Sequence, residues 1–353
     1  MPIQINNIPL VSIVMPAFNE EKFMAETIVY IQQQTYTNWE LIVVDDQSKD
    51  NTQAIVASFS DKDDRIKLIV RNREPKGAQV CRNTGIEAAS GKYILILDSD
   101  DIIRPYALMQ RVSFMEEHPD LDFAIFKGIN YDEKTKTINE NRKWGVNPHC
   151  DIISRFLMAN YPFGMWNCIF KANIAKNNLF DEKIMIYQDF DFLIRILLQQ
   201  PNYAFDENSE IDYLYRQGHT GTITSNFISE GKYESTKYLF KKTMVEISEL
   251  SDFENKKKDF FGFFRLQLEK VALTGTSNQL KDFQTFIRSY YAFPYSVKLS
   301  IANTLLRGPI MSNPRYRRRY VHFVIAILYS PTTIFRQLSR IGNAHMAQKE
   351  ESN

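Results

Sequence analysis

The chain is poor in cysteine and has no long apolar run, and both features limit what it can be. Its 353 residues include only three cysteines, Cys81, Cys150 and Cys168. An odd number of cysteines, at spacings unlike those of metal ligands, argues against a disulfide framework and suits a reducing cytoplasm. No segment reaches the roughly 18 consecutive apolar residues that a membrane span needs, and the first residues lack the basic-then-apolar pattern of a secretory signal. We therefore expect a cytoplasmic protein.

The chain also lacks a strong overall charge. Its formal net charge is +1, so no global field favours nucleic acid as a partner. The charge is nevertheless uneven, because residues 301–353 carry eight Lys and Arg against two Glu. Four of these arginines (Arg315, Arg317, Arg318 and Arg319) precede the apolar run 321–329. That combination is typical of an interfacial membrane anchor, while a packed helix with a solvated arginine face explains it equally well. The sequence therefore does not decide whether 315–329 contacts the inner face of the cell membrane peripherally.

Two common phosphate-binding motifs are missing as well. The chain contains neither G-x-G-x-x-G nor G-x-x-x-x-G-K-[ST], so neither a Rossmann dinucleotide site nor a P-loop is expected.

Strand and helix patterns alternate through the first 100 residues. Apolar runs at 11–15, 40–44, 66–70 and 93–97 are separated by segments with helical patterns. This alternation predicts an α/β fold with a doubly wound, mostly parallel sheet, Rossmann-like in its organisation. Near-continuous apolar runs fit strands that are covered on both faces.

Later segments are less regular. The pattern predicts strands at 122–126 and 166–170, a loop or hairpin at 132–148, and helices at 151–158 and 188–198. Long helical patterns then occupy 229–272 and 279–306. We therefore expect an α/β domain over residues 1–225 and a helical C-terminal region over 226–353.

Two of the predicted strands end in carboxylates. Asp45 and Asp46 follow one strand, while Asp98, Ser99 and Asp100 follow another. The carboxyl ends of parallel strands are where open α/β sheets bind ligands. Asp98 and Asp100 have the spacing to hold a hard divalent cation that also bridges a substrate diphosphate. The alternative is a polar turn, with Asp101 as the N-cap of the helix that follows Pro105.

The segment after the first strand offers an aromatic ring. Phe18 follows Pro16 and Ala17, and a nucleobase stacked on it would gain roughly 1–3 kcal/mol. A core position is the commoner fate of a single Phe.

Four segments together resemble the inverting family 2 glycosyltransferases of the GT-A fold, of the kind that build bacterial cell-surface polysaccharides. They are 11–20, 43–50, 77–85 and 97–101, and their order and spacing match the family. The resemblance covers roughly residues 10–225. It implies nucleotide-sugar binding over about 10–105 and an acceptor side over about 106–225.

The resemblance also implies roles for individual residues on the donor side. Asp100 corresponds to the direct ligand of Mn²⁺ or Mg²⁺ in the DXD pair, and Asp98 more closely to a contact with the ribose. Gln47 replaces a more usual glycine. The other implied contacts are Pro16, Ala17 and Phe18 with the base, Glu20 with the ribose or phosphates, Asp46 with the base imide, Asp45 and Ser99 beside them, and Arg82 near the ribose and diphosphate.

An acidic pair opens the predicted helix at 188–198. Inverting transfer requires a base that takes the proton of the acceptor hydroxyl, and the resemblance assigns this role to Asp189, with Asp191 as a close competitor. Gln188 replaces the glutamate that is usual in the family. A carboxylate in the first turn is also stabilised by the helix dipole, so a capping aspartate is the alternative.

Segment 215–224 resembles the loop that closes over the diphosphate in this family. By that resemblance Arg216 would neutralise the departing nucleotide, and His219 would bind the metal or a phosphate, although a single loop histidine is commonly just solvated. Trp144 and Trp166 are candidates for an acceptor pocket, with core packing as the alternative for Trp166.

The sequence therefore predicts a metal-dependent inverting glycosyltransferase. Its expected partners are a nucleoside-diphosphate sugar, with a UDP-sugar favoured, and a glycan or lipid-linked acceptor. Two alternatives belong to other classes: a nucleotidyltransferase that makes sugar nucleotides, and a non-catalytic sugar-nucleotide-binding module. The first needs a triphosphate loop rich in Gly and Lys or Arg, which residues 11–20 do not provide. The second would be favoured by loss of the DXD pair or of the base, and both are present.

Overall fold

The computed structural model describes residues 8–218 and 229–291. His219, the basic tail at 315–329 and the predicted helix beyond residue 291 lie outside these ranges. Contacts divide the chain into two compact units. The first consists of Met1–Phe156, Asn160–Ser225 and Glu230–Lys257, and the second of the remaining residues. The first unit therefore continues past the boundary at residue 225 that the sequence predicts.

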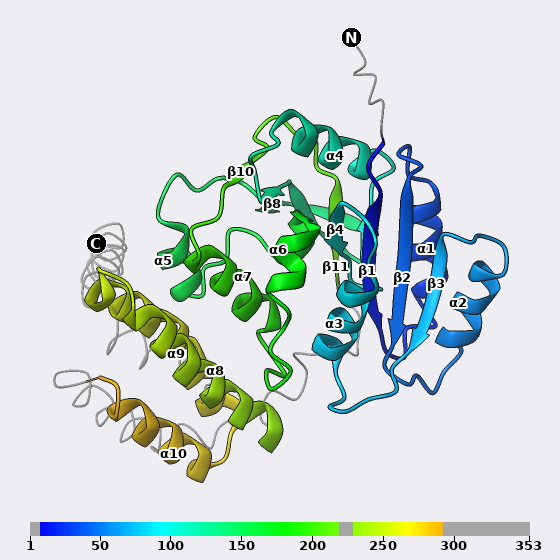
Figure 1. The fold of residues 1–353 in the computed structure, drawn as a ribbon. Helices are drawn as coiled ribbons and strands as arrows, with labels where there is room; N and C mark the ends of the chain where they lie inside the picture. Colours follow the sequence, from blue (N-terminus) through cyan, green and yellow to red (C-terminus); the bar gives the residue numbers. More distant parts are fainter. Residues whose placement is uncertain (1–7, 219–228, 292–353) are drawn as a thin grey trace, which may run out of the picture. The chain divides into compact units, whose positions relative to one another are not determined.

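A seven-stranded sheet forms the centre of the first unit, with strand order β10-β6-β9-β4-β1-β2-β3. Figure 1 shows β1, β2 and β3 running side by side. Pairing is parallel except at β9, which runs antiparallel to both β4 and β6. The strands are β1 (Val11–Ala17), β2 (Trp39–Asp45), β3 (Ile66–Val70), β4 (Tyr93–Ile96), β6 (Phe123–Ile125), β9 (Cys168–Lys171) and β10 (Tyr203–Phe205). The predicted mostly parallel α/β sheet is confirmed.

Helices connect the parallel strands. Gly85 in α3 lies so close to β1 that a Cβ atom added there would be 2.4 Å from Cγ1 of Val14. Only glycine allows this approach of helix and sheet. The helices of this part of the chain are α1 (Met24–Gln32), α2 (Thr52–Ser60), α3 (Ala78–Ala88), α4 (Ala107–Glu117), α5 (Ile152–Leu157), α6 (Ala172–Asn177) and α7 (Gln188–Leu198).

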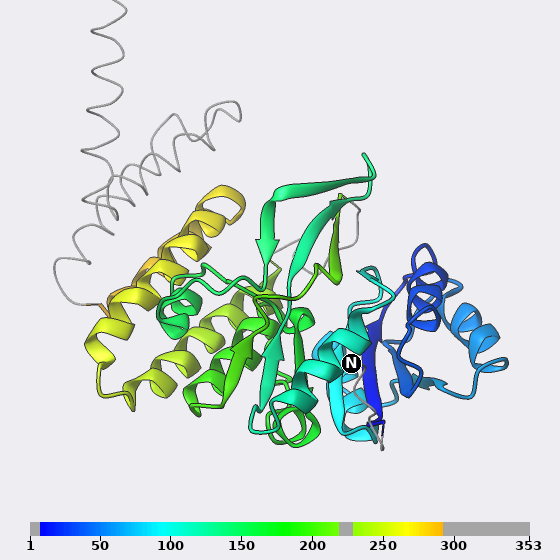
Figure 2. The same ribbon diagram turned by 90° about the horizontal axis from the view of Figure 1, so that it is seen from above.

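A second, four-stranded sheet has the order β5-β11-β7-β8. Figure 2 shows the hairpin of β7 and β8 extending away from the main sheet. Its strands are β5 (Ile102–Ile103), β7 (Gly128–Asp132), β8 (Thr137–Trp144) and β11 (Tyr213–Gln217). For residues 132–148 the sequence predicts a loop or a hairpin, and the structure has the hairpin. No pattern in the sequence indicated that β5 and β11, which are far apart in the chain, would join this hairpin.

Two predicted boundaries were wrong. Residues Met165–Asn167 form a short 3-10 helix (η1), so the strand predicted at 166–170 begins only at Cys168. The helical run predicted over 229–272 is two helices, α8 (Glu230–Ser248) and α9 (Phe253–Thr274).

Aromatic packing dominates the second unit. Helix α9 passes from the first unit into the second, where α10 (Ser277–Arg288) follows it. Phe264 stacks on Phe283 with ring centroids 5.2 Å apart, and Tyr291 packs edge-on against Phe261. Within residues 8–218 and 229–291, no helix combines the length and the apolar character needed to cross a membrane.

Candidate active site

The carboxyl end of β4 carries the acidic turn that the sequence singled out. Asp98 is one-quarter exposed, and its Oδ1 accepts a hydrogen bond of 2.7 Å from Nη2 of Arg82. Asp100 is partly exposed, whereas Ser99 is buried and its carbonyl accepts from the Thr27 hydroxyl. The turn therefore presents the Asp98 and Asp100 carboxylates outward and uses the Ser99 backbone for packing.

Asp101 has a different environment from its neighbours. Its side chain is buried and accepts hydrogen bonds from the Tyr213 hydroxyl and from the Arg216 backbone N–H. Burial, together with the charges of Asp100 and Asp98, raises the pKa of Asp101 well above its ordinary value. The alternative that Asp101 caps the next helix is wrong, because α4 begins at Ala107. Asp101 instead attaches β11 to the acidic turn.

Arg216 is buried and its guanidinium is held by protein groups. Nε donates to the Asp100 carbonyl at 2.5 Å, and Nη2 donates to Glu26 at 2.7 Å. Nη1 pairs with Glu133. Two carboxylates therefore already neutralise this arginine, which supports a role in holding the acidic turn rather than in meeting a phosphate.

Arg82 connects the acidic turn to helix α7. While Nη2 binds Asp98, Nη1 donates to Oε1 of Gln188 at 2.6 Å. Gln188 in turn donates to Gln79 in α3. The buried Nε of Arg82 has no hydrogen-bond partner among the residues that the structure describes. Gln188 is therefore a neutral acceptor that helps to hold Arg82 in place.

Asp189 lies in the first turn of α7, directly after Gln188. Tyr187, which precedes the helix, has a left-handed φ of 61°. Burial raises the pKa of Asp189 above its ordinary value, and the charge of Asp98 acts in the same direction. The two carboxylates are thus near enough for the charge of Asp98 to affect Asp189.

Asp191, the competing candidate, is buried among cations. Its Oδ2 accepts from Nε of Arg195 at 3.0 Å, and its Oδ1 accepts from Nζ of Lys242 at 2.7 Å. Lys242 comes from α8 and also binds Asp181. Both oxygens of Asp191 are therefore occupied, one by Arg195 of the same helix and one by Lys242 of α8, and the geometry favours Asp189 as the reactive carboxylate.

The ends of β1 and β2 form the other side of the site. Phe18 is 41% exposed, and the Nζ atom of Lys76 lies 3.7 Å from its ring centroid. Pro16 and Ala17 are buried, and the Ala17 carbonyl accepts from the backbone N–H of Asp46 at 2.8 Å. Phe18 is therefore not a core residue, and its ring faces solvent and a cation.

Asp45 and Asp46 are both buried after β2. The Asp45 carboxylate accepts hydrogen bonds from Ser48 of the following turn and from Gln53 of α2, whereas Asp46 pairs with Arg71. The contact expected between Asp46 and the base imide stays a prediction.

Gln47 and Glu20 shape the turns on this side of the site. Gln47 has a left-handed φ of 61°, which explains why glycine is usual there. The Glu20 backbone N–H donates to the Thr52 hydroxyl, which joins the β1 turn to α2.

Sequence reasoning missed three of the cations that organise the site: Arg71, Lys76 and Lys242. Arg71 directly follows β3, the neighbour of β2 in the sheet, so its placement beside Asp46 was accessible from the strand order. Lys242 carried no such signal, because it lies far along the chain in a helix with many lysines.

The acidic turn suits a cation whose other ligands come from a substrate. Within the described ranges, no three His, Cys, Asp or Glu side chains converge as a closed metal site would require. Mg²⁺ in particular is commonly held by one or two carboxylates together with phosphate oxygens and water. Asp100, with Asp98 beside it, fits this open kind of site. His219, the other predicted ligand, lies outside the described residues.

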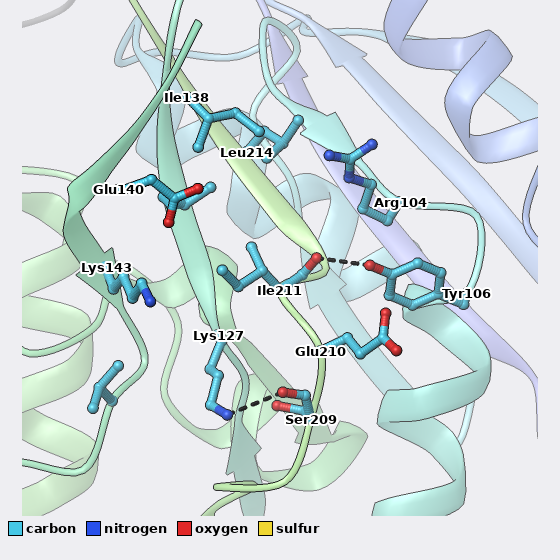
Figure 3. A pocket seen from close by; sticks show the side chains of 12 residues that line it. Arg104, Tyr106, Lys127, Ile138, Glu140, Lys143, Ser209, Glu210, Ile211 and Leu214 are labelled. Carbon is cyan, nitrogen blue, oxygen red and sulfur yellow. Dashed lines mark hydrogen bonds between the residues drawn. The ribbon is translucent and has the colours of Figure 1, made fainter.

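A pocket of about 620 Å³ lies on the face of the small sheet opposite to the one that carries Tyr213 and Tyr215 (Figure 3). Ile129, Ile138 and Leu214 line it, with Tyr106 donating to the Ile211 carbonyl at one wall. Successive side chains on a strand point to opposite faces, so Leu214 faces this pocket while Tyr213 and Tyr215 face the acidic turn. None of the sequence-predicted site residues lines the pocket.

Comparison with known protein families gives a clear match. The family model described as glycosyl transferase family 2 matches residues 12–180. An uncharacterized glycosyltransferase of Methanocaldococcus jannaschii is 32% identical over 210 residues, which cover 59% of this chain and 71% of that protein.

A second relative has a defined reaction in its name. It is the Escherichia coli UDP-Glc:alpha-D-GlcNAc-diphosphoundecaprenol beta-1,3-glucosyltransferase, 48% identical over 106 residues. The match covers 30% of this chain and 41% of that protein, so the chain spans less than half the length of this relative.

Among solved structures, Staphylococcus aureus TarS 1-349 in complex with UDP-GlcNAc has a similar fold. Its TM-score is 0.60 at 20% identity, and the match covers 93% of this chain and 91% of that one. At this identity the likeness shows the fold alone, and it agrees with the predicted GT-A architecture.

Proposed function

Because the chain belongs to glycosyltransferase family 2, we propose that it moves a sugar from a nucleoside-diphosphate sugar to an acceptor hydroxyl with inversion. The observation that carries this proposal is the bridge formed by Arg82. Its two terminal nitrogens bind Asp98 on β4 and Gln188 on α7. The donor-side acidic turn and the helix that begins with Asp189 are thereby fixed to the same cation.

The donor is bound, in this proposal, across the ends of β1, β2 and β4. Phe18 offers an exposed ring for the base, and the partner of that ring, Lys76, adds a positive charge. Pro16, Ala17, Asp45 and Asp46 form the wall beside it, with Glu20 and Ser99 at its edge. The Arg82 guanidinium binds Asp98 in the acidic turn, and we assign it to the diphosphate side.

Asp100 and Asp98 are the residues that would hold Mn²⁺ or Mg²⁺. A bound cation would offset the negative charge that develops on the leaving diphosphate.

Asp189 is assigned as the general base. A half-buried carboxylate with a raised pKa binds a proton more readily than an ordinary aspartate. A pKa nearer the working pH is what a general base needs. Its Oδ atoms would take the proton of the acceptor hydroxyl as the glycosidic oxygen of the diphosphate leaves from the other side of the anomeric carbon.

The donor and acceptor classes are drawn from relatives. The Escherichia coli relative is named as a transferase of glucose from UDP-Glc to a diphosphoundecaprenol-linked sugar. We therefore favour a UDP-sugar as donor, a lipid-linked glycan as acceptor, and a place in polysaccharide biosynthesis.

A donor panel tests the function. UDP-, GDP- and dTDP-sugars are incubated with the enzyme, with and without Mn²⁺, and release of nucleoside diphosphate is measured. We expect release from one nucleotide class, dependent on the cation. No release from any of them, with or without acceptor glycosides, would contradict the proposal. Retention of the anomeric configuration in an isolated product would contradict inversion.

A further inference from the structure

A group of aromatic side chains stands beside the acidic turn, and two of them, Trp144 and Trp166, are the acceptor-pocket candidates of the sequence analysis. We call Trp144, Trp166 and Tyr215 the aromatic wall. The rings of Trp166 and Tyr215 are stacked, with centroids 5.2 Å apart and planes 10° from parallel. Trp144 packs edge-on against both of them, at 6.1 and 6.4 Å.

The wall is fixed next to the candidate catalytic carboxylates. Tyr215 precedes Arg216, whose backbone N–H donates to Asp101 at 2.6 Å. Burial raises the pKa of Tyr215, and four carboxylates add to this effect: those of Asp101, Asp98, Asp100 and Asp189. Tyr215 therefore lies within electrostatic reach of both the acidic turn and the start of α7.

Two buried donors near this wall lack acceptors. Trp166 is only 9% exposed, and its indole N–H meets no acceptor in the described part of the chain. The same holds for the hydroxyl of Tyr161, whose ring packs against Phe190, the neighbour of Asp189. A buried donor without an acceptor costs about 1–3 kcal/mol, so an arriving ligand with oxygen acceptors would relieve the cost.

The chemistry of this surface matches a sugar ring. Ligand pockets combine aromatic surface with a few placed polar groups, and a pyranose has an apolar C–H face and a rim of hydroxyls. Trp144 and Tyr215 are partly exposed, so part of the aromatic surface is open to such a ring.

The position of the wall points to the acceptor rather than the donor. In the main sheet β4 lies between β1 and β9. The nucleotide residues follow β1 and β2 on one side of β4, while Trp166 immediately precedes β9 on the other side. An inverting displacement requires the acceptor to approach opposite the leaving diphosphate, and the wall lies on the β9 side of β4, away from the nucleotide residues.

We propose that the aromatic wall binds a pyranose ring of the acceptor glycan and holds its hydroxyl next to Asp189. This assignment rests on the proposed glycosyl transfer and goes beyond it, because it names the acceptor subsite. Trp144 and Tyr215 supply the stacking surface, and Trp166 and Tyr161 supply hydrogen-bond donors for the hydroxyl rim. All four are specificity residues rather than catalytic ones.

Binding is tested directly, without knowledge of the natural acceptor. Saturation-transfer NMR is recorded on the enzyme with UDP, diamagnetic Mg²⁺ and the methyl glycosides of glucose, galactose, N-acetylglucosamine and N-acetylgalactosamine. We expect transfer to the C–H protons of at least one glycoside, with loss of most of that signal in Trp144→Leu and Tyr215→Leu. Tyr215→Phe should keep it, because the ring remains.

The matched control is Ile138→Ala. Ile138 lies on the same strand as Trp144 and lines the pocket on the opposite face of the sheet, so this change perturbs the hairpin without touching the wall. It should leave the glycoside signal intact. No signal in the wild type, an unchanged signal in both leucine variants, or an equal loss in Ile138→Ala would overturn the proposal.

Kinetics separate this proposal from the function itself. In both leucine variants the acceptor KM should rise about tenfold or more, while the donor KM and donor hydrolysis without acceptor change less than about twofold. An equal rise in the donor KM would move the wall to the donor sugar and overturn the acceptor assignment. Absence of donor hydrolysis and transfer in the wild type would instead contradict the proposed function.

Discussion

Two carboxylates at the start of α7, separated by one residue, have opposite environments. Asp189 is within reach of the charge of Asp98, whereas both oxygens of Asp191 bind cations. Asp189→Asn keeps the size of the side chain but cannot accept a proton. We expect turnover to fall by roughly 10²–10⁴-fold with little change in donor affinity, measured by steady-state kinetics and nucleotide titration.

Asp191→Asn is the matched comparison for this change. It leaves Lys242 and Arg195 without their shared partner, so its main effect should be a loss of stability, of about 1–3 kcal/mol after allowance for the partly exposed cations. A larger turnover loss in Asp191→Asn than in Asp189→Asn would transfer the assignment of base to Asp191.

The raised pKa of Asp189 has consequences for both activity and stability. A base must be ionised, so kcat/KM should fall on acidification at a pH above the ordinary range of aspartate. An acid with a raised folded-state pKa destabilises the fold at pH values above that pKa and has no effect below its unfolded-state pKa. Asp189→Asn should therefore melt at a higher temperature than wild type at pH 8, and the difference should vanish in acid. A lower melting temperature for the variant at pH 8 would contradict this account.

Asp100 is the residue whose removal tests the cation. It lies partly exposed after β4, outside the core, and is the residue to which we assign the cation. We expect Asp100→Ala to abolish cation-dependent donor binding, measured by calorimetry with UDP and Mn²⁺, while the melting temperature stays close to that of wild type. Normal turnover of this variant, or full wild-type activity in excess EDTA, would rule out the metal assignment.

At the scale of elements, helix α8 supports the catalytic side of α7. Lys242 bridges Asp191 in α7 and Asp181 in the loop before it. One turn further along α8, Glu246 is half-buried, and its Oε2 has no partner among the described residues. Burial raises the pKa of Glu246 to about 7, against the lowering effect of Lys242. The contact between α7 and α8 therefore contains a carboxylate that is costly to ionise.

Glu246→Gln should relieve this cost. The penalty appears as the pH rises from the ordinary glutamate value toward about 7, and it is complete above that pH. We expect the variant to be more stable than wild type by about 1–3 kcal/mol at pH 8, with no difference near pH 4, measured by urea unfolding. Glu234→Gln, on the exposed part of the same helix, serves as the control and should be nearly neutral. Equal effects of the two changes would show that burial of Glu246 is not the cause.

At the scale of the whole molecule, the basic tail is a separate question from the transfer reaction. Arg315 to Arg319 and the apolar run 321–329 lie outside the described residues, so the anchor hypothesis depends on their composition. Each basic residue near an anionic surface contributes about 1 kcal/mol. We predict that the full chain floats with vesicles of phosphatidylglycerol and that truncation after Asn313 abolishes flotation. Salt at 0.5 M should release the full chain, because salt screens the attraction between the arginines and the anionic lipid (Debye length about 3 Å at 1 M). If both proteins stay in the vesicle-free fraction, the tail has a structural role only.

The sequence determined those parts of the protein whose signals are local. Apolar runs predicted β1 to β4, and the carboxylates that directly follow β4 needed only strand direction to be placed at the ligand edge. The limits of α7, Gln188 to Leu198, were also predicted correctly, because its periodicity is strong and its acidic first turn marks the start. Phe18 and Asp98 could be predicted as site residues because they closely follow β1 and β4 in the sequence.

Tertiary structure decided what distant partners control. Asp101 is paired with Tyr213, 112 residues away, and Asp191 with Lys242, 51 residues away. No local pattern tells which of several neighbouring aspartates will be neutralised in this way, because a carboxylate has the same sequence signal whether it faces a ligand or a buried cation. The small sheet also depends on distant partners, since β5, β7 and β11 are short and acquire their register only from one another. Assembly of that sheet brought Trp144 of β8 against Tyr215 of β11.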